Sequence, residues 1–133
     1  MTWGIVERQR ILLVDDEPAY HDIVRAILSK SGVTLHGVRD APAAFHALRG
    51  DSFALILMDI QMPGISGFRG VAHIRTTAEW TKTVPIIAFT ALRPPEGERY
   101  FLGRGFDAWL PKPFTAAELE TSLARWLNAE FQI

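Results

Sequence analysis

The sequence contains no cysteine, so disulfide bonds, catalytic thiols and thiolate metal sites are excluded. It also lacks an excess of either charge, because 14 Lys and Arg stand against 15 Asp and Glu, a formal net charge of −1. Such a balance gives no indication that nucleic acid or a membrane surface is a direct partner. The longest apolar runs, near residues 11–14 and 53–58, are far too short to span a bilayer.

What remains is the composition of an ordinary globular domain. Hydrophobic residues make up 48% of the 133 positions and charged residues 22%, which is enough to build a sizeable core. This length suits one domain over residues 1–133, with a core from about residue 9 to residue 130. The first ten residues are too polar for a signal peptide, and together with the missing cysteine this favours the cytoplasm.

Four short apolar runs predict strands that are covered on both faces, as in a parallel sheet: Ile11–Val14, Phe53–Met58, Val84–Phe89 and Phe106–Leu110. A fifth segment, Val33–Val38, mixes polar residues with a glycine and is typical of an edge strand.

Amphipathic stretches between these runs predict helices. The first carries an apolar stripe at i, i+3, i+4, i+7 and i+8, formed by Tyr20, Ile23, Val24, Ile27 and Leu28. Gly32 stands where a left-handed residue would end this helix. Asp40 is placed to cap the second helix, and the inward residues there would be Ala44, Phe45 and Leu48.

Three further helices follow. The third is expected from Phe68 to about Thr76, with Phe68, Val71 and Ala72 facing inward. The fourth, at residues 96–102, has the weakest signal because two prolines precede it and Gly97 lies inside it. The fifth begins with a capping box from Thr115 to Glu118 and has a core stripe of Leu119, Leu123, Trp126 and Leu127.

Strict alternation of five strands with five helices predicts an α/β fold with a doubly wound parallel sheet and right-handed crossovers. Ligands of such sheets bind beyond the carboxyl ends of the strands. The polar residues collect at that edge. Asp15, Asp16 and Glu17 follow the first strand, Asp59 ends the third, Thr90 ends the fourth and Lys112 follows the fifth.

The chemistry of these residue types is specific. Two carboxylates about 4 Å apart repel by roughly 4 kcal/mol at an effective dielectric constant near 20, so three acids together need a proton or a cation. An all-oxygen ligand set with open positions favours Mg²⁺, which neutralises charge during phosphoryl transfer. An aspartate can act as the nucleophile, and a lysine facing the acids across a phosphate-sized gap would bind a phosphoryl oxygen.

Four motifs together resemble the receiver domains of two-component response regulators: Ile11–Pro18, Leu55–Gly64 with Gly67, Ile87–Ala91 and Leu110–Phe114. They occur in order and with the family's spacing across about residues 9–130. The resemblance implies a flavodoxin-like (βα)5 fold with strand order 2-1-3-4-5. It also implies that the chain is no enzyme beyond its own phosphorylation and dephosphorylation.

By this resemblance, Asp59 is the phosphoacceptor. Mg²⁺ (or Mn²⁺) would be bound by Asp16 directly and by Asp15 mainly through water, with Asp59 and the backbone carbonyl of Gln61 as further metal-binding groups. Thr90, Ala91 and Lys112 would bind the phosphoryl group.

Thr90 and Trp109 would form the pair of switch residues, acting on the face made by the fourth helix, fifth strand and fifth helix. The Lys112–Pro113 peptide bond is cis in many relatives.

The resemblance also implies partners. A histidine kinase or a histidine phosphotransfer protein would be the donor, and a further protein would receive the signal. The chain would act as a monomer or a phosphorylation-dependent dimer, without direct contact to nucleic acid or membrane, either alone or as part of a larger regulator or hybrid kinase.

Three positions depart from the common pattern. Trp109 is bulkier than the usual tyrosine or phenylalanine. Gln61 and Leu92 flank the route by which water would reach the phosphoryl group, and apolar Leu92 predicts slow self-dephosphorylation.

Plainer interpretations exist for each residue. The triplet at residues 15–17 could merely cap the first helix, since carboxylates there favour the helix dipole. Thr90 could be an ordinary strand-end hydroxyl, Lys112 a solvated loop residue, and Trp109 a packing residue.

Two other functions compete with the receiver interpretation. One is an aspartate-nucleophile phosphatase of the haloacid-dehalogenase type, although its nucleophile lies on the first strand with a second aspartate two residues on. The other is a receiver-like interaction module that never accepts phosphate.

Overall fold

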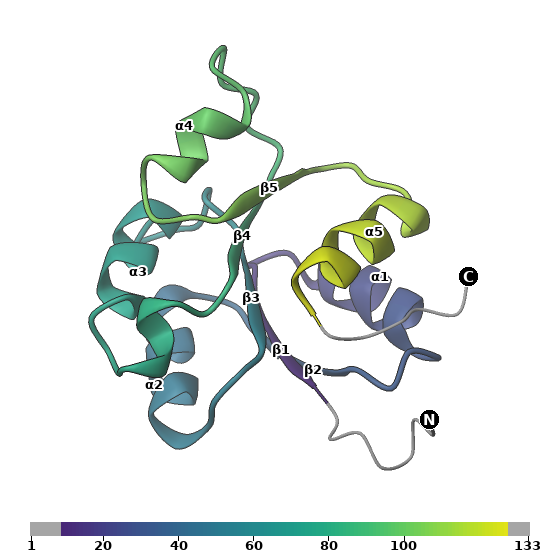
Figure 1. Cartoon of the computed structure of the whole chain (residues 1–133), viewed down its shortest axis with the longest axis horizontal. Coiled ribbons are helices and arrows are strands. Elements are labelled where there is room, and N and C mark those ends of the chain that lie inside the picture. Colours follow the sequence, from purple (N-terminus) through teal and green to yellow (C-terminus); the bar gives the residue numbers. More distant parts are fainter. Residues whose placement is uncertain (1–8, 128–133) are drawn as a thin grey trace.

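Strands and helices alternate along the whole part of the chain that the structure, a computed structural model, describes, which is residues 9–127 (Figure 1). The strands are β1 (Arg10–Val14), β2 (Thr34–Val38), β3 (Leu55–Met58), β4 (Ile86–Thr90) and β5 (Ala108–Pro111). The helices are α1 (Pro18–Leu28), α2 (Ala41–Gly50), α3 (Gly67–Ile74), α4 (Glu98–Leu102) and α5 (Ala116–Trp126), with a short 3₁₀ helix at Trp80–Lys82. Residues 128–130 of the expected core lie outside the described residues.

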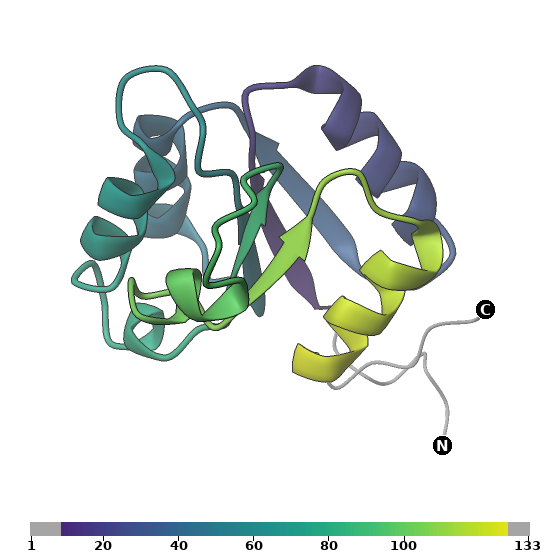
Figure 2. The ribbon, with the colours of Figure 1, turned by 90° about the horizontal axis from the view of Figure 1, so that it is seen from above.

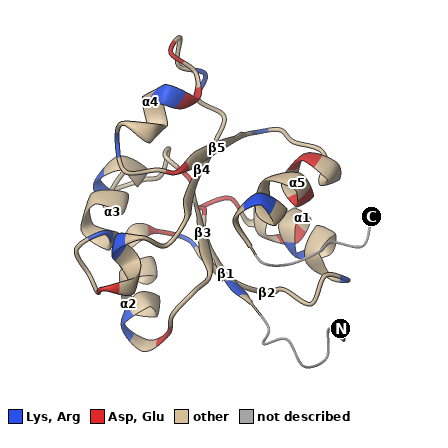
Figure 3. Ribbon diagram, in the orientation of Figure 1, with Lys and Arg blue, Asp and Glu red and all other residues tan. Residues whose placement is uncertain are grey.

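The five strands form one sheet of order β2-β1-β3-β4-β5, and every neighbouring pair is parallel. This confirms the predicted fold class and strand order. Helices α2, α3 and α4 cover one face of the sheet and α1 and α5 the other, as Figures 1 and 2 show from two directions. Charged residues of both signs are spread over these helices (Figure 3).

Successive side chains of each central strand enter two different cores. On the side of α2, α3 and α4 the sheet contributes Leu12, Val14, Ile56, Met58, Ile86 and Ala88. On the side of α1 and α5 it contributes Ile11, Leu13, Leu55, Leu57, Ile87 and Phe89. Because both faces of the sheet are buried, the sequences of the central strands are continuous apolar runs and do not alternate between apolar and polar residues. The partly exposed β2 lies at the edge, as its polar sequence predicted.

The two predicted helix caps are confirmed. The Asp40 side chain accepts a hydrogen bond from the Ala43 backbone N–H, 2.8 Å away, and so caps α2. Thr115 and Glu118 form both hydrogen bonds of a capping box at the start of α5. The weakly marked α4 has only five residues. Gly32 adopts the predicted left-handed conformation, with φ of +81°, although α1 already ends at Leu28.

Two predicted inward faces are wrong in part. Ile23 is 43% exposed, because α1 packs through Val24 and Leu28 and the sheet does not reach the far flank of its apolar stripe. Ala72 is exposed as well. The short helix α3 instead buries the face spaced at i, i+3, i+4 and i+7, formed by Gly67, Gly70, Val71 and Ile74.

Within residues 9–127, none of the helices combines the length and apolar character that crossing a membrane requires.

Candidate functional site

The ends of four parallel strands bring the predicted site residues to one edge of the sheet. Strand β1 leads into Asp15, β3 into Asp59 and β5 into Lys112, while Thr90 is the last residue of β4. The pairing of Val14 with Met58 sets β1 and β3 in register, and the Asp59 N–H donates to the Val14 carbonyl over 2.9 Å. Asp15 and Asp59 are neighbours for this reason.

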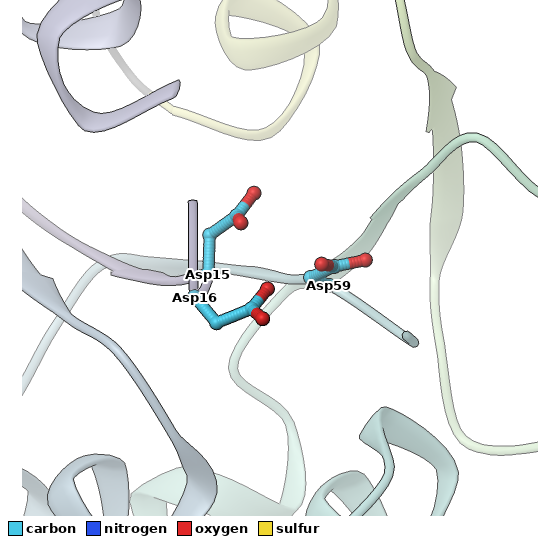
Figure 4. A group of neighbouring side chains, drawn as sticks. All are labelled: Asp15, Asp16 and Asp59. Atoms are coloured by element: carbon cyan, nitrogen blue, oxygen red, sulfur yellow. The ribbon is translucent and has the colours of Figure 1, made fainter. Parts of the chain in front are cut away.

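Three carboxylates meet at this edge, as Figure 4 shows. Asp15, Asp16 and Asp59 each offer an oxygen atom, and these atoms all lie within 4.8 Å of one another. Asp15 is fully buried and Asp59 is 3% exposed, so water screens their repulsion poorly. The predicted gathering of the acids is confirmed.

Lys112 is the cation of the site, but it sits closer to the acids than predicted. Its ammonium Nζ lies 2.6 Å from Asp15 Oδ2 and 3.6 Å from Asp59 Oδ2, and the residue is 4% exposed. The expectation that Lys112 faces the acids across a phosphate-sized gap is therefore wrong for this structure. A buried ammonium takes the nearest carboxylate as its partner, because leaving it unpaired would be costly.

One lysine does not balance three acids. Burial raises the pKa of Asp59 to about 6, and the charges of Asp15 and Asp16 push it the same way, against the lowering effects of Lys112 and of the Gln61 N–H. The surplus negative charge and the all-oxygen donor set fit a small divalent cation such as Mg²⁺.

Backbone groups fix the two buried carboxylates. Asp15 Oδ1 accepts a hydrogen bond from the Glu17 N–H over 2.9 Å, and Asp59 Oδ1 accepts one from the Gln61 N–H over 3.2 Å. Glu17 occupies the N-cap position of α1, yet its side chain makes no capping hydrogen bond. The interpretation of residues 15–17 as a mere helix cap is therefore not supported.

Gly67 lets α3 begin directly against the backbone of Asp59. A Cβ atom at this position would collide with the carbonyl oxygen of Asp59 and the Cα atom of Ile60. The Gly67 N–H also donates to the Ile60 carbonyl over 3.0 Å. Only glycine allows so close an approach, so Gly67 belongs to the support of the site.

Thr90 is fully buried, and its Oγ1 accepts a hydrogen bond from the Leu92 N–H over 3.2 Å. Its carbonyl oxygen accepts a hydrogen bond from Trp109 Nε1 over 3.4 Å. The half-buried Trp109 ring lies 5.2 Å from the Phe101 ring and 5.7 Å from the Arg93 guanidinium. Trp109 thus packs in contact with the backbone of Thr90, and its role as a switch residue stays a prediction.

The other predicted tuning residues surround this region. Gln61 and Ala91 are exposed, and the half-buried Leu92 packs against the core on the α2, α3 and α4 side. The Lys112–Pro113 bond is cis, as the resemblance implied.

Sequence reasoning missed three contacts to the site. The His21 Nε2–H donates to the Asp15 carbonyl oxygen over 2.7 Å, so this histidine supports the backbone of the acidic pair. Arg93 donates to the Lys112 carbonyl oxygen over 2.7 Å. The Tyr20 ring lies against the Lys112 ammonium. The only signal in the sequence is that Tyr20 and His21 occupy the first turn of a helix beginning beside the acids.

Comparison with known proteins gives a consistent result. Residues 11–124 match the family described as "Response regulator receiver domain". Sensor protein GacS of Pseudomonas syringae pv. syringae is 35% identical over 119 residues, which cover 88% of this chain but only 13% of that protein.

Two solved structures are also similar. The receiver domain of sensor histidine kinase PA1611 from Pseudomonas aeruginosa PAO1, with a magnesium ion coordinated in its active site cleft, is 36% identical, with a TM-score of 0.79 over 90% of this chain and 98% of that one. Chemotaxis protein CheY4 of Vibrio cholerae is 28% identical, with a TM-score of 0.84 over 91% of this chain and 100% of that one.

Proposed function

The chain belongs to the response regulator receiver domain family, and from that premise we propose that it accepts a phosphoryl group on Asp59 in a Mg²⁺-dependent reaction. One observation carries this proposal. A buried aspartate at the end of β3 lies among two further acids, with a lysine ammonium 3.6 Å from its oxygen.

The reaction is a phosphoryl transfer to a carboxylate. An oxygen of ionised Asp59 forms a bond to phosphorus, while the bond from phosphorus to the donor breaks and the donor leaves with its electron pair. The donor is a phosphohistidine of a histidine kinase or of a histidine phosphotransfer protein, or a small acyl phosphate. The product is an acyl phosphate on Asp59.

The acidic cluster would hold Mg²⁺ or Mn²⁺ through Asp16 and Asp59, with Asp15 acting mainly through water and the backbone carbonyl of Gln61 completing the set. When bound, the ion supplies neutralisation of the charge that develops on the phosphoryl oxygens. With a pKa of about 6, Asp59 is mostly ionised at neutral pH, and the bound ion would keep it ionised at lower pH as well.

Lys112 and Thr90 would stabilise the product. The ammonium of Lys112 is already between Asp15 and Asp59, so a short shift carries it from Asp15 to a phosphoryl oxygen. The hydroxyl of Thr90 donates to a second oxygen, and the neighbouring Ala91 completes the phosphate-binding segment.

The signal would leave through α4, β5 and α5. As Thr90 turns toward the added charge, the Trp109 ring, which is hydrogen bonded to the Thr90 carbonyl, repacks against Phe101 and α4. Such a local charge event becomes a signal when a partner reads the altered surface. That partner is a downstream protein, and the domain works in the cytoplasm as a monomer or as a phosphorylation-dependent dimer.

A spectroscopic titration tests this proposal. Fluoroberyllate, which mimics a phosphoryl group on aspartate, is added to the ¹⁵N-labelled protein with Mg²⁺. We expect saturation at one equivalent, with shifts at Thr90, at the Trp109 indole and along α4, β5 and α5. Asp59→Asn should abolish the response, whereas Asp22→Asn, on the exposed part of α1, should keep it.

The same samples separate the rival functions. Steady release of phosphate from a phosphomonoester, over many turnovers, would favour the phosphatase. Absence of both Mg²⁺ binding and a fluoroberyllate response would favour the interaction module.

A further inference from the structure

The ammonium of Lys112 is surrounded by aromatic rings as well as by carboxylates. Its Nζ atom lies 4.1 Å from the centroid of the Tyr20 ring and 4.9 Å from that of Phe89. An ammonium has three protons, and the structure gives Nζ one short hydrogen bond, to Asp15, and a longer ion pair with Asp59. The rings occupy space that water would otherwise take.

Three rings from three parts of the chain form this surface, which we call the aromatic box: Tyr20, Phe89 and Phe114. Tyr20 comes from the first turn of α1, Phe89 from β4, and Phe114 from the segment between β5 and α5. The Tyr20 and Phe89 rings meet edge to face with centroids 5.5 Å apart, and Phe114 lies 5.3 Å from Phe89 and 6.0 Å from Tyr20. The box is therefore continuous, and Phe89 and Phe114 come from the segments that also carry Thr90 and Lys112.

The attraction between these groups is electrostatic. The face of an aromatic ring is negative, and its attraction for a cation is stronger when water is excluded. Lys112 is 4% exposed, so the contact with Tyr20 is made in a largely desolvated place. A flexible four-carbon side chain is thereby restrained at its charged end, between two carboxylates and two rings.

We infer that Tyr20 is a positioning residue for Lys112. Through its ring face, it keeps the ammonium in place to receive a phosphoryl oxygen once Lys112 leaves Asp15. This inference rests on the proposed function for its consequence, but not for the contact itself. A purely structural role is the alternative, in which Tyr20 only packs α1 against β4 and the charge of Lys112 is irrelevant.

The decisive variants change the ring's electrostatics more than its shape. Tyr20→Phe keeps the negative face of the ring. A series of increasingly fluorinated phenylalanines at this position reduces the negative potential of the ring face while almost preserving the side-chain volume. Tyr20→Leu removes the ring. Ile27→Ala serves as the matched control, because Ile27 is also a half-buried residue of α1 packed on the same core.

The measurement is the affinity for fluoroberyllate at saturating Mg²⁺, beside the affinity for Mg²⁺ alone. We expect Tyr20→Leu to weaken fluoroberyllate binding by about three- to tenfold, with Tyr20→Phe close to the parent and the fluorinated series falling in order. The affinity for Mg²⁺ alone should stay within about twofold, since the contact of the Tyr20 ring is with the Lys112 ammonium. Ile27→Ala should lower stability without changing fluoroberyllate affinity.

A second readout does not depend on phosphorylation at all. In the anion-free protein, the Lys112 ammonium should give a resolved ¹⁵N signal that broadens in Tyr20→Leu as its protons exchange faster with water. The role of Tyr20 would be overturned if fluoroberyllate affinity and the Lys112 signal both stayed unchanged across the fluorinated variants. These variants remain informative even if Tyr20→Leu does not fold. A parent protein that ignores fluoroberyllate but shows the Lys112 effect would instead count against the proposed function alone.

Discussion

Asp59 holds a buried carboxyl group next to buried Asp15 and the more exposed Asp16, and this affects folding as well as chemistry. Burial raises its pKa from 3.8 to about 6 in the metal-free protein. Between these pH values the folded state holds a proton that the unfolded chain has released. The contribution of Asp59 to stability is therefore fully present below about pH 3.8 and is lost as the pH rises through about 6.

We predict from this that Asp59→Asn stabilises the metal-free protein at pH 7, by about 1–2 kcal/mol. The gain is smaller than the whole pKa shift suggests, because Lys112 loses one of its two carboxylate partners. Urea unfolding in EDTA at several pH values measures the effect, and the advantage of the variant should shrink toward pH 4. An Asn variant that is less stable than its parent at pH 7 would contradict this electrostatic explanation.

Leu92 gives a prediction about the lifetime of the phosphorylated state. Its half-buried side chain packs against the core near α4, and we expect this apolar group to hinder the approach of water to phosphorylated Asp59. Replacing it by Glu or Lys should therefore change the rate of self-dephosphorylation, with Glu the faster of the two variants because a carboxylate can orient water. Following the loss of phosphate after removal of the donor measures this. Identical rates in parent and both variants would refute it.

Among the elements, the start of α3 is tied to the backbone of Asp59 through Gly67. A methyl group there would press on the backbone of Asp59 and Ile60, which cannot move aside as a side chain could. We predict that Gly67→Ala costs about 1–3 kcal/mol of unfolding free energy and also weakens Mg²⁺ binding. Gly50→Ala, in open space at the end of α2, is the matched control and should be neutral or slightly stabilising. Chemical denaturation and Mg²⁺ titration of both variants decide the matter, and equal effects of the two substitutions would contradict the explanation.

The elements also indicate how far sequence reasoning reaches. Continuous apolar runs located the central strands because both faces of a parallel sheet are buried. Asp40 and the Thr115–Glu118 box located helix starts because capping is a local interaction. The inward faces were harder, since Ile23 and Ala72 are apolar and correctly spaced but lie beyond the area that the sheet covers. That limit depends on how each helix sits on the sheet, which no local pattern encodes.

The candidate site was likewise predictable in its overall arrangement but not in its side-chain contacts. Topology placed Asp15, Asp59, Thr90 and Lys112 at one edge, since parallel strands all end there. Topology did not reveal that Lys112 pairs with Asp15, nor that Tyr20 and His21 touch the site. Those contacts depend on side-chain rotamers and on the exact position at which α1 begins, which no sequence pattern specifies.

At the scale of the whole molecule, a cation that binds only the folded state should stabilise it. Three acids against one lysine leave the site with excess negative charge, while the rest of the chain is balanced near neutrality. We predict that Mg²⁺ at 100 times its dissociation constant adds about 2.7 kcal/mol to the free energy of unfolding. Thermal unfolding with Mg²⁺ and with EDTA measures this, and Asp16→Asn should reduce the difference while Asp22→Asn leaves it intact. A melting temperature indifferent to Mg²⁺ would mean that the acids do not form a metal site.

We propose that this domain carries its signal as a phosphoryl group on Asp59. The most direct measurement is the intact mass after incubation with acetyl phosphate, with Mg²⁺ or with EDTA, for the parent and for Asp59→Asn. We predict the mass of one phosphoryl group on the parent, dependent on Mg²⁺, lost at alkaline pH and absent from the variant. Equal labelling of parent and Asp59→Asn, or no labelling of a folded parent that binds Mg²⁺, would contradict it.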